Sequence, residues 1–264
     1  MKINFVGDIG SYNDITSVIF KNIIDNSNSD DIIILLGDNF YPNGIKSIND
    51  IDWEKFNNLN IPIATYSVLG NHDYLGNINA QIEYKLNNWN MDSNYYKKST
   101  DKYDLFFIDT NVITPEYSNL NYNIVKSKLK EEPLEYSKKM LEWLDDELSK
   151  STKVKIVMGH YPIISHGIYG INHILFKKLF PIFKKHNVSY YFSGHDHNLQ
   201  IIDVTSENYI LKQVISGSSS CIYPLFNNIS KKIFSKNGHV TIDTSDESVN
   251  IIDNKNKIIY SEKN

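Results

Sequence analysis

Apolar residues in the first seventy positions fall into three short runs, and each run ends at a glycine followed by a polar residue. The runs cover residues 2–6, 32–36 and 63–69, and the residues that follow them are Gly7-Asp8, Gly37-Asp38 and Gly70-Asn71. Short apolar runs with such boundaries are typical of buried strands. The segment after Asn13 has apolar residues at helical spacing, and residues 53–56 indicate a short helix. Alternating strands and helices predict a parallel sheet with right-handed crossovers.

The second half repeats this pattern. A strand at 154–158 is followed by Gly159-His160, a helix is expected over 173–186, and a strand at 189–192 leads to Gly194-His195-Asp196-His197. Between the halves we expect a helix at 80–86, a strand pair at 95–98 and 104–109, an irregular surface excursion at 114–130 and a helix at 134–149. After residue 198 we expect one antiparallel run of strands, at 199–204, 209–215, 239–242 and 248–252, which residues 257–260 close. No linker or internal repeat divides the chain, so the sequence predicts a single domain over 1–264.

Composition narrows the class of protein. The chain has 264 residues, 41% of them hydrophobic, and a net charge of -4. This balance gives no electrostatic reason to expect nucleic-acid or membrane binding, and no apolar run approaches the roughly 20 residues of a membrane span. Cys221 is the only cysteine, so no intramolecular disulfide can form. No signal peptide is visible, so we expect a cytoplasmic monomer, although a chain trimmed of a leader would look the same.

Polar residues follow five of the expected strands. The candidate ligands are Asp8, Asp38 with Tyr41, Asn71 with His72, His160, and His195 with His197. Because sites in open α/β sheets form at the carboxyl ends of strands, we expect these side chains to meet. A single histidine after a strand usually has a structural role. Candidate ligands at the ends of five strands are better explained by a shared site. Carboxylate, amide and imidazole groups at one edge suit two cations, and paired metals about 3.5–4 Å apart serve phosphoryl displacement.

With these blocks the chain resembles the calcineurin-like metallophosphoesterases, and among them the purple acid phosphatases of the small tartrate-resistant type. The family pattern is met by five blocks, at Gly7-Asp8, Gly37-Asp38-Asn39-Phe40-Tyr41, Gly70-Asn71-His72-Asp73, Gly159-His160-Tyr161-Pro162 and Gly194-His195-Asp196-His197. Order and spacing agree from Ile3 to about Gly217. The resemblance implies an α/β fold, a four-layer α-β-β-α sandwich with mixed sheets and a dinuclear site at the strand carboxyl ends.

The resemblance also implies a role for each site residue. Asp8, Tyr41 and His197 would bind Fe(III), and Asn71, His160 and His195 would bind a divalent metal, either Fe(II), Zn(II) or Mn(II). Asp38 would bridge the two. His72 would contact the phosphate or protonate the leaving oxygen, and His173 lies where the small phosphatases place another substrate-side histidine. The implied reaction is hydrolysis of phosphate monoesters, on a small molecule or a phosphoprotein, by a metal-bound hydroxide.

Three readings stay open at this point. Besides a phosphomonoesterase, the chain could be a sister enzyme that acts on phosphodiesters or phosphoproteins, or a catalytically silent binding module. Sister phosphodiesterases usually carry Asp-x-His in the first block, whereas this chain has Asp8-Ile9-Gly10. Silent modules typically lose ligands, and none is missing here. Residues 110–132 fall where the small phosphatases carry a repressing loop, and their sequence neither supports nor opposes that role.

Overall fold

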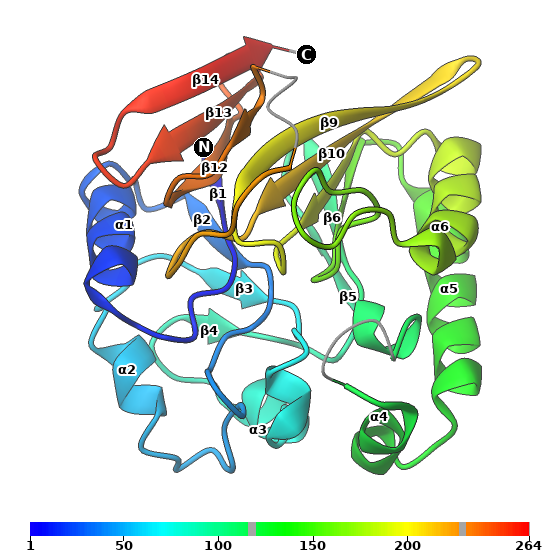
Figure 1. Cartoon of the computed structure of the whole chain (residues 1–264), viewed down its shortest axis with the longest axis horizontal. Helices are drawn as coiled ribbons and strands as arrows, with labels where there is room; N and C mark the ends of the chain where they lie inside the picture. Colours follow the sequence, from blue (N-terminus) through cyan, green and yellow to red (C-terminus); the bar gives the residue numbers. More distant parts are fainter. Residues whose placement is uncertain (116–119, 227–230, 264) are drawn as a thin grey trace.

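Two mixed β-sheets form the centre of the protein, and helices cover their outer faces (Figure 1). The computed structural model describes residues 1–115, 120–226 and 231–263. In Figure 1, α1 (Asp14–Asp25) and α2 (Trp53–Asn57) flank one side, while α5 (Pro133–Lys150) and α6 (His173–His186) flank the other. Shorter helical segments are α3 (Ile78–Glu83), α4 (Tyr122–Leu129) and the single turns Asp73–Leu75 and Thr110–Val112. The predicted four-layer α/β sandwich is confirmed.

The first sheet, which we call sheet A, has the strand order β14-β13-β12-β1-β2-β3-β4. Its strands are β1 (Lys2–Val6), β2 (Ile32–Leu35), β3 (Thr65–Ser67), β4 (Trp89–Asn90), β12 (Gly238–Asp243), β13 (Ser248–Asp253) and β14 (Ile258–Lys263). Strands β1 to β4 are parallel, and β12 joins β1 in antiparallel register with Ile3 opposite Ile242. The first three strands therefore end on one edge.

The second sheet, which we call sheet B, has the order β11-β9-β10-β8-β7-β6-β5. Its strands are β5 (Tyr96–Ser99), β6 (Tyr103–Phe107), β7 (Val154–Met158), β8 (Tyr190–Ser193), β9 (Leu199–Ser206), β10 (Tyr209–Ser216) and β11 (Ile233–Phe234). Strands β6, β7, β8 and β10 are parallel, and β5 and β9 run against them. Phe5 of β1 stacks on Phe192 of β8 with ring centroids 3.5 Å apart, in the buried core that both sheets share.

Helices α1, α5 and α6 begin within one residue of the position that the sequence indicates, whereas α3 covers Ile78–Glu83 and not the expected 80–86. Asn13 caps α1, because its side-chain oxygen accepts a hydrogen bond from the amide of Thr16 at 3.1 Å. In α5, the buried residues are Pro133, Ser137, Met140, Leu144 and Leu148, whose apolar members lie near the helical period.

Two expectations about irregular or C-terminal segments are wrong. The expected single antiparallel run after residue 198 is divided, because β9 and β10 extend sheet B whereas β12 to β14 extend sheet A. The segment 114–130 contains helix α4, capped by the side chain of Asn121. Only Val125 of that helix is buried, so the periodic apolar signal that would have predicted it is weak. Residues 116–119 lie outside the described part of the chain.

Candidate metal centre

Backbone conformation directs three of the predicted ligands at the strand ends. Asp8, Asp38 and His195 each follow a glycine and have φ values of 60°, 54° and 65°. A non-glycine residue in this left-handed region costs about 1–2 kcal/mol. All three are buried. Such strain persists only where the surroundings enforce it, and it clusters at functional sites.

The loops from β2 and β3 approach so closely that one position must be glycine. A Cβ atom on Gly70 would lie 2.2 Å from both the backbone nitrogen and Oδ1 of Asp38. The buried carboxylate of Asp73 holds the same two loops, because it accepts hydrogen bonds from the amides of Gly70 at 2.8 Å and Asn39 at 3.1 Å. Burial, and then the charge of Asp38, raise the pKa of Asp73 to about 6. Asp73 therefore stabilises the two loops that carry the ligands Asp38 and Asn71.

Asp8, Tyr41 and His197 place three donor atoms at nearly equal separations, in what we call the phenol triad. Tyr41 Oη lies 3.2 Å from Asp8 Oδ1 and 3.3 Å from His197 Nε2, and His197 Nε2 lies 3.3 Å from Asp8 Oδ1. Ligands held about 2.0–2.2 Å from one cation lie about 3 Å from each other. The triad therefore has the spacing that one shared cation requires.

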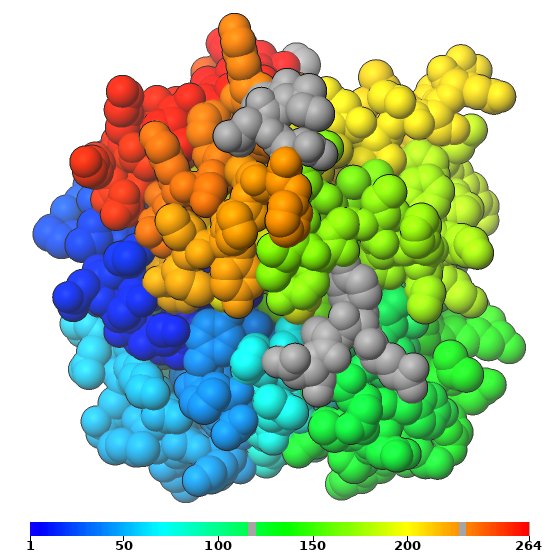
Figure 2. All heavy atoms as spheres, in the orientation of Figure 1, coloured from blue at the N-terminus to red at the C-terminus, as the bar shows by residue number. Residues whose placement is uncertain are grey.

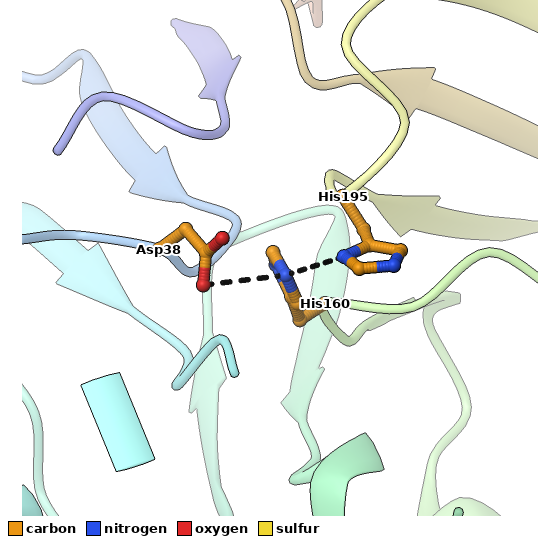
Figure 3. A group of neighbouring side chains, drawn as sticks. All are labelled: Asp38, His160 and His195. Carbon is orange, nitrogen blue, oxygen red and sulfur yellow. Dashed lines mark hydrogen bonds and ion pairs between the residues drawn. The ribbon is translucent and has the colours of Figure 1, made fainter. Parts of the chain in front are cut away.

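A second group of donors, which we call the imidazole triad, consists of Asn71, His160 and His195. His160 Nε2 lies 3.1 Å from Asn71 Oδ1 and 3.2 Å from His195 Nδ1. Asp38 Oδ1 lies 3.5 Å from the same His160 nitrogen, and Figure 3 shows the carboxylate and the two rings in line. Ligand atoms of Asp38, His160 and His195 all lie within 4.8 Å of one another. The seven predicted ligands thus meet as two adjacent groups.

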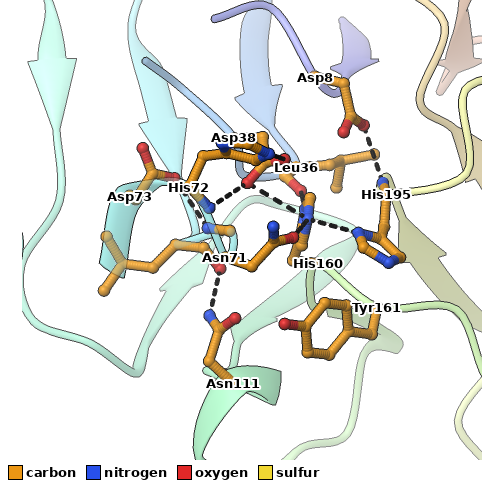
Figure 4. Close-up of polar contacts among 12 residues, drawn as sticks. Asp8, Leu36, Asp38, Asn71, His72, Asp73, Asn111, His160, Tyr161 and His195 are labelled. Carbon is orange, nitrogen blue, oxygen red and sulfur yellow. Dashed lines mark hydrogen bonds and ion pairs between the residues drawn. The ribbon is translucent and has the colours of Figure 1, made fainter. Parts of the chain in front are cut away.

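Hydrogen bonds outside the triads set the orientation of the rings. His160 Nδ1 lies 2.8 Å from the carbonyl oxygen of Leu36, which can only accept, so this nitrogen carries the hydrogen and Nε2 keeps its lone pair in the neutral ring. The amide of His195 donates to Asp8 Oδ2 at 2.8 Å, which connects the two triads (Figure 4).

Burial and charge give the two groups different protonation behaviour. Burial, and then the neighbouring His160, hold the pKa of His195 well below its usual value. Burial lowers the pKa of His197, but the charge of Asp8 outweighs it and raises that pKa to about 11. Burial, and then Asp8, raise the pKa of Tyr41 well above its usual value. Without a cation, this buried cluster therefore favours a protonated His197 and a neutral phenol, so a metal would have to displace both protons.

His72 lies beside the triads and differs from their members because it is only half-buried. Its backbone amide donates to Asp38 Oδ1 at 2.9 Å, and its ring nitrogen Nδ1 contacts the carbonyl oxygen of Pro42 at 2.5 Å. Since that carbonyl accepts, Nδ1 is the donor and Nε2 is the nitrogen left for a substrate. His72 lines a cavity of about 270 Å³ together with Asp38, Tyr41, Asn71, Tyr169, His195, His197 and Tyr223.

His173 lies outside this arrangement. It is the first residue of α6, its side chain is exposed, and it does not line the cavity. Asn172 caps the helix by accepting a hydrogen bond from the amide of Leu175 at 3.0 Å. A catalytic role for His173 stays a prediction that no described contact supports.

Three residues at the site were not expected from the sequence. Tyr169 and Tyr223 line the cavity, and the Cys221 thiol contacts His197 Nδ1. They lie in loops, where no apolar period or strand-end pattern marks a position. Only the tertiary contacts with the histidines reveal them.

The comparisons with known proteins agree with this geometry. The family model "Calcineurin-like phosphoesterase" matches residues 1–199. The chain belongs to the calcineurin-like phosphoesterase family. It is 34% identical to tartrate-resistant acid phosphatase type 5 of Oryctolagus cuniculus over 73% of this chain and 62% of that protein. It is also 34% identical to purple acid phosphatase 3 of Arabidopsis thaliana over 81% of this chain and 61% of that protein.

This calcineurin-like phosphoesterase also resembles solved structures. GAP50, the anchor in the inner membrane complex of Plasmodium, superposes with a TM-score of 0.77 and 25% identity over 100% of this chain and 88% of that one. A purple acid phosphatase from yellow lupin seeds gives a TM-score of 0.71 at 14% identity, over 99% of this chain and 53% of that one, and this shows the shared fold. The chain spans about three fifths of the length of the curated relatives it matches. No helix within residues 1–115, 120–226 or 231–263 is long and apolar enough to cross a membrane.

Proposed function

We propose that this protein is a purple-acid-phosphatase-like enzyme that hydrolyses phosphate monoesters at a dinuclear metal centre. The observation that carries the proposal is the convergence of seven candidate ligands into two triads joined by Asp38, with donor atoms 3.1–3.5 Å apart. The phenol triad would hold iron(III), and the imidazole triad would hold iron(II), zinc(II) or manganese(II). The likeness to acid phosphatases at 34% identity supports this reading.

The donor set fits a pair of cations of different character. The phenol triad supplies a carboxylate, a phenol and one imidazole and shares Asp38, so it is the harder side, while two imidazoles and an amide oxygen form the softer one. Two buried carboxylates, Asp8 and Asp38, have no lysine among the residues that line the cavity, so cations would balance their charge. When bound, such a pair neutralises phosphoryl oxygens and lowers the pKa of water.

The protein's own groups position the substrate and move a proton. The Pro42 carbonyl holds the Nδ1–H of His72, so Nε2 can donate a proton to the departing ester oxygen only when the ring is an imidazolium. Nε2 lies 3.9 Å from Asp38 Oδ2, so the nitrogen that would donate the proton faces the carboxylate that joins the two triads. The oxygen of water forms a bond to phosphorus, the P–O bond to the alcohol breaks, and the alcohol leaves with that proton. One proton of the water stays on the new phosphate, and the other returns to His72.

Structural similarity to GAP50, the anchor in the inner membrane complex of Plasmodium, favours a second candidate, an anchoring module. The complete ligand set favours the enzyme. The residue after Ile9 is Gly10, where sister phosphodiesterases usually carry histidine, so we favour monoesters over diesters.

The test compares phenyl phosphate with diphenyl phosphate. We expect kcat/KM for the monoester to exceed that for the diester by at least about tenfold, and chelation followed by metal return to abolish and restore turnover. Asn71→Ala should lose activity, while Asn254→Ala, remote from the site, is the matched control. A preference for the diester would assign the protein to the phosphodiesterases, and no turnover of either ester by metal-loaded protein would favour the anchoring module.

A further inference from the structure

Two tyrosines from separate loops cover histidines of the candidate metal centre. Tyr223 stacks on His197 with ring centroids 4.2 Å apart and planes 3° from parallel. Tyr169 lies over His195 with a centroid distance of 4.0 Å and an angle of 35°. Both tyrosines line the cavity of about 270 Å³.

Hydrogen bonds fix the two loops to the site and to each other. The amide of Tyr223 donates to the carbonyl of His197 at 2.7 Å, and the amide of Phe226 donates to the carbonyl of His166 at 3.0 Å. The hydroxyl of Ser165 donates to the carboxylate of Asp196, next to both histidines. Figure 2 shows the yellow-green and orange segments that contain these loops in contact on the front face. The tyrosines are therefore held in place before any substrate arrives.

Large apolar side chains next to the tyrosines are exposed. Ile168 is 45% exposed, Ile222 is 47% exposed and Phe226 is 69% exposed. We call Ile168, Tyr169, Ile222, Tyr223 and Phe226 the aromatic collar. Of these five residues, Tyr169 and Tyr223 line the cavity, and the other three are near them in the chain. Exposed apolar groups beside a cavity mark surfaces that bind apolar ligands.

The described lining of the cavity has neither a lysine nor an arginine side chain. None of the residues that line the cavity is a lysine, and all 27 residues counted as lysine or arginine are lysines, so the chain has no guanidinium for bidentate phosphate binding. A substrate with further phosphates or carboxylates would meet no lysine or arginine among the described lining residues. An aromatic ring or alkyl group on the substrate would contact the apolar side chains of the aromatic collar.

We propose that the aromatic collar selects phosphate monoesters whose alcohol carries an aromatic ring next to the ester oxygen. This inference rests on the proposed function and names its substrate class. Tyr169 and Tyr223 contact the departing group as specificity-determining residues. Hydrolysis converts the ester and water into the free aromatic alcohol and inorganic phosphate, with no oxidant or further reactant.

The test uses benzyl phosphate and ethyl phosphate, two unactivated alkyl esters that differ in the ring. We expect kcat/KM to favour benzyl phosphate by about 2- to 10-fold for each ring contact. In Tyr169→Leu and Tyr223→Leu this ratio should fall toward 1, and it should be retained in Tyr169→Phe and Tyr223→Phe. Tyr260→Leu, on β14, is the control that leaves the ratio unchanged.

Binding gives a second readout that does not depend on turnover. Calorimetry should show benzylphosphonate binding more tightly than ethylphosphonate, with the difference lost in both leucine variants. Equal turnover of both esters by the wild type, or a benzyl preference that survives in the leucine variants, would overturn the inference and leave the phosphatase intact. If the metal-loaded wild type hydrolyses neither ester, the proposed function fails and the inference fails with it. Thermal unfolding of each variant separates these outcomes from misfolding.

Discussion

Sheet A and sheet B differ in the side chains that they bring to their common edge. The ends of β1, β2 and β3 supply the oxygen donors Asp8, Asp38, Tyr41 and Asn71, whereas the ends of β7 and β8 supply His160, His195 and His197. Neither sheet contains a complete triad, since each triad takes donors from both. The centre therefore depends on how the sheets pack, and each sheet alone would have only part of a metal site.

The orienting contacts cross between the sheets in both directions. His160 of the second sheet is turned by the Leu36 carbonyl of the first, and Asp8 of the first accepts from the amide of His195. The amide of Gly7 also donates to the carbonyl of Ser216 at 2.7 Å. Each side thus positions the ligands of the other, which makes the geometry precise without a single continuous element.

Removing the connection between the triads should have the largest effect. Asp38→Ala removes the carboxylate 3.5 Å from His160 Nε2 and should abolish metal binding and reduce phosphatase activity to the detection limit. Elemental analysis and a kinetic assay check this, with the exposed Asp203→Ala as the control. Full metal content and activity in Asp38→Ala would show that the two groups are independent.

His72 follows β3 of sheet A, which supplies the oxygen donors, but we expect it to bind substrate and not metal. His72→Ala should keep both ions and lose about 10²–10⁴ in turnover, as for removal of a general acid. The loss should shrink for esters with good leaving groups, which depart without a proton. Loss of a metal ion in His72→Ala would move this residue into the ligand set, and an equal loss for all esters would indicate phosphate binding in place of proton donation.

Asp109 connects sheet B to the loop after β3 of sheet A and is not a candidate ligand, so its substitution tests folding stability and not catalysis. It follows β6, accepts a hydrogen bond from Tyr74 at 2.5 Å, and burial raises its pKa to about 6. A carboxyl with a raised folded-state pKa stabilises the folded state in its protonated form, so its contribution is lost as pH rises from about 4 to about 6. Over this pH range the free energy of unfolding should fall by an amount on the order of 3 kcal/mol.

Denaturant unfolding at several pH values tests this expectation. The wild type should lose stability relative to Asp109→Asn as pH rises through this window, because asparagine does not titrate. Parallel stability curves for the two proteins would mean that Asp109 keeps an ordinary pKa.

Local patterns predicted the strand ends well because each one combines an apolar run, a glycine and a polar residue. Asp8, Asp38 and His195 could be placed at one edge for that reason. The partner of β12 could not be predicted, since its pairing with β1 joins residues that are more than 230 positions apart. Helix α4 was missed because it buries little apolar surface.

The collar and Cys221 could not be predicted for a different reason. Tyr169 and Tyr223 acquire their importance from stacking on His195 and His197, and that contact exists only after both sheets and both loops are in place. His173 shows the converse, since its position in the sequence suggested a role, whereas its side chain lies exposed at the start of α6.

Metal content with the visible spectrum of the oxidised protein tests the central claim most directly. We expect about two metals per chain, at least one of them iron. We also expect a visible band from charge transfer between the Tyr41 phenolate and iron(III), and we expect this band to be absent in Tyr41→Phe. Fully active protein with one metal or none would contradict the dinuclear centre. An iron-loaded, oxidised wild type without the band, or a band unchanged in Tyr41→Phe, would contradict the phenol triad.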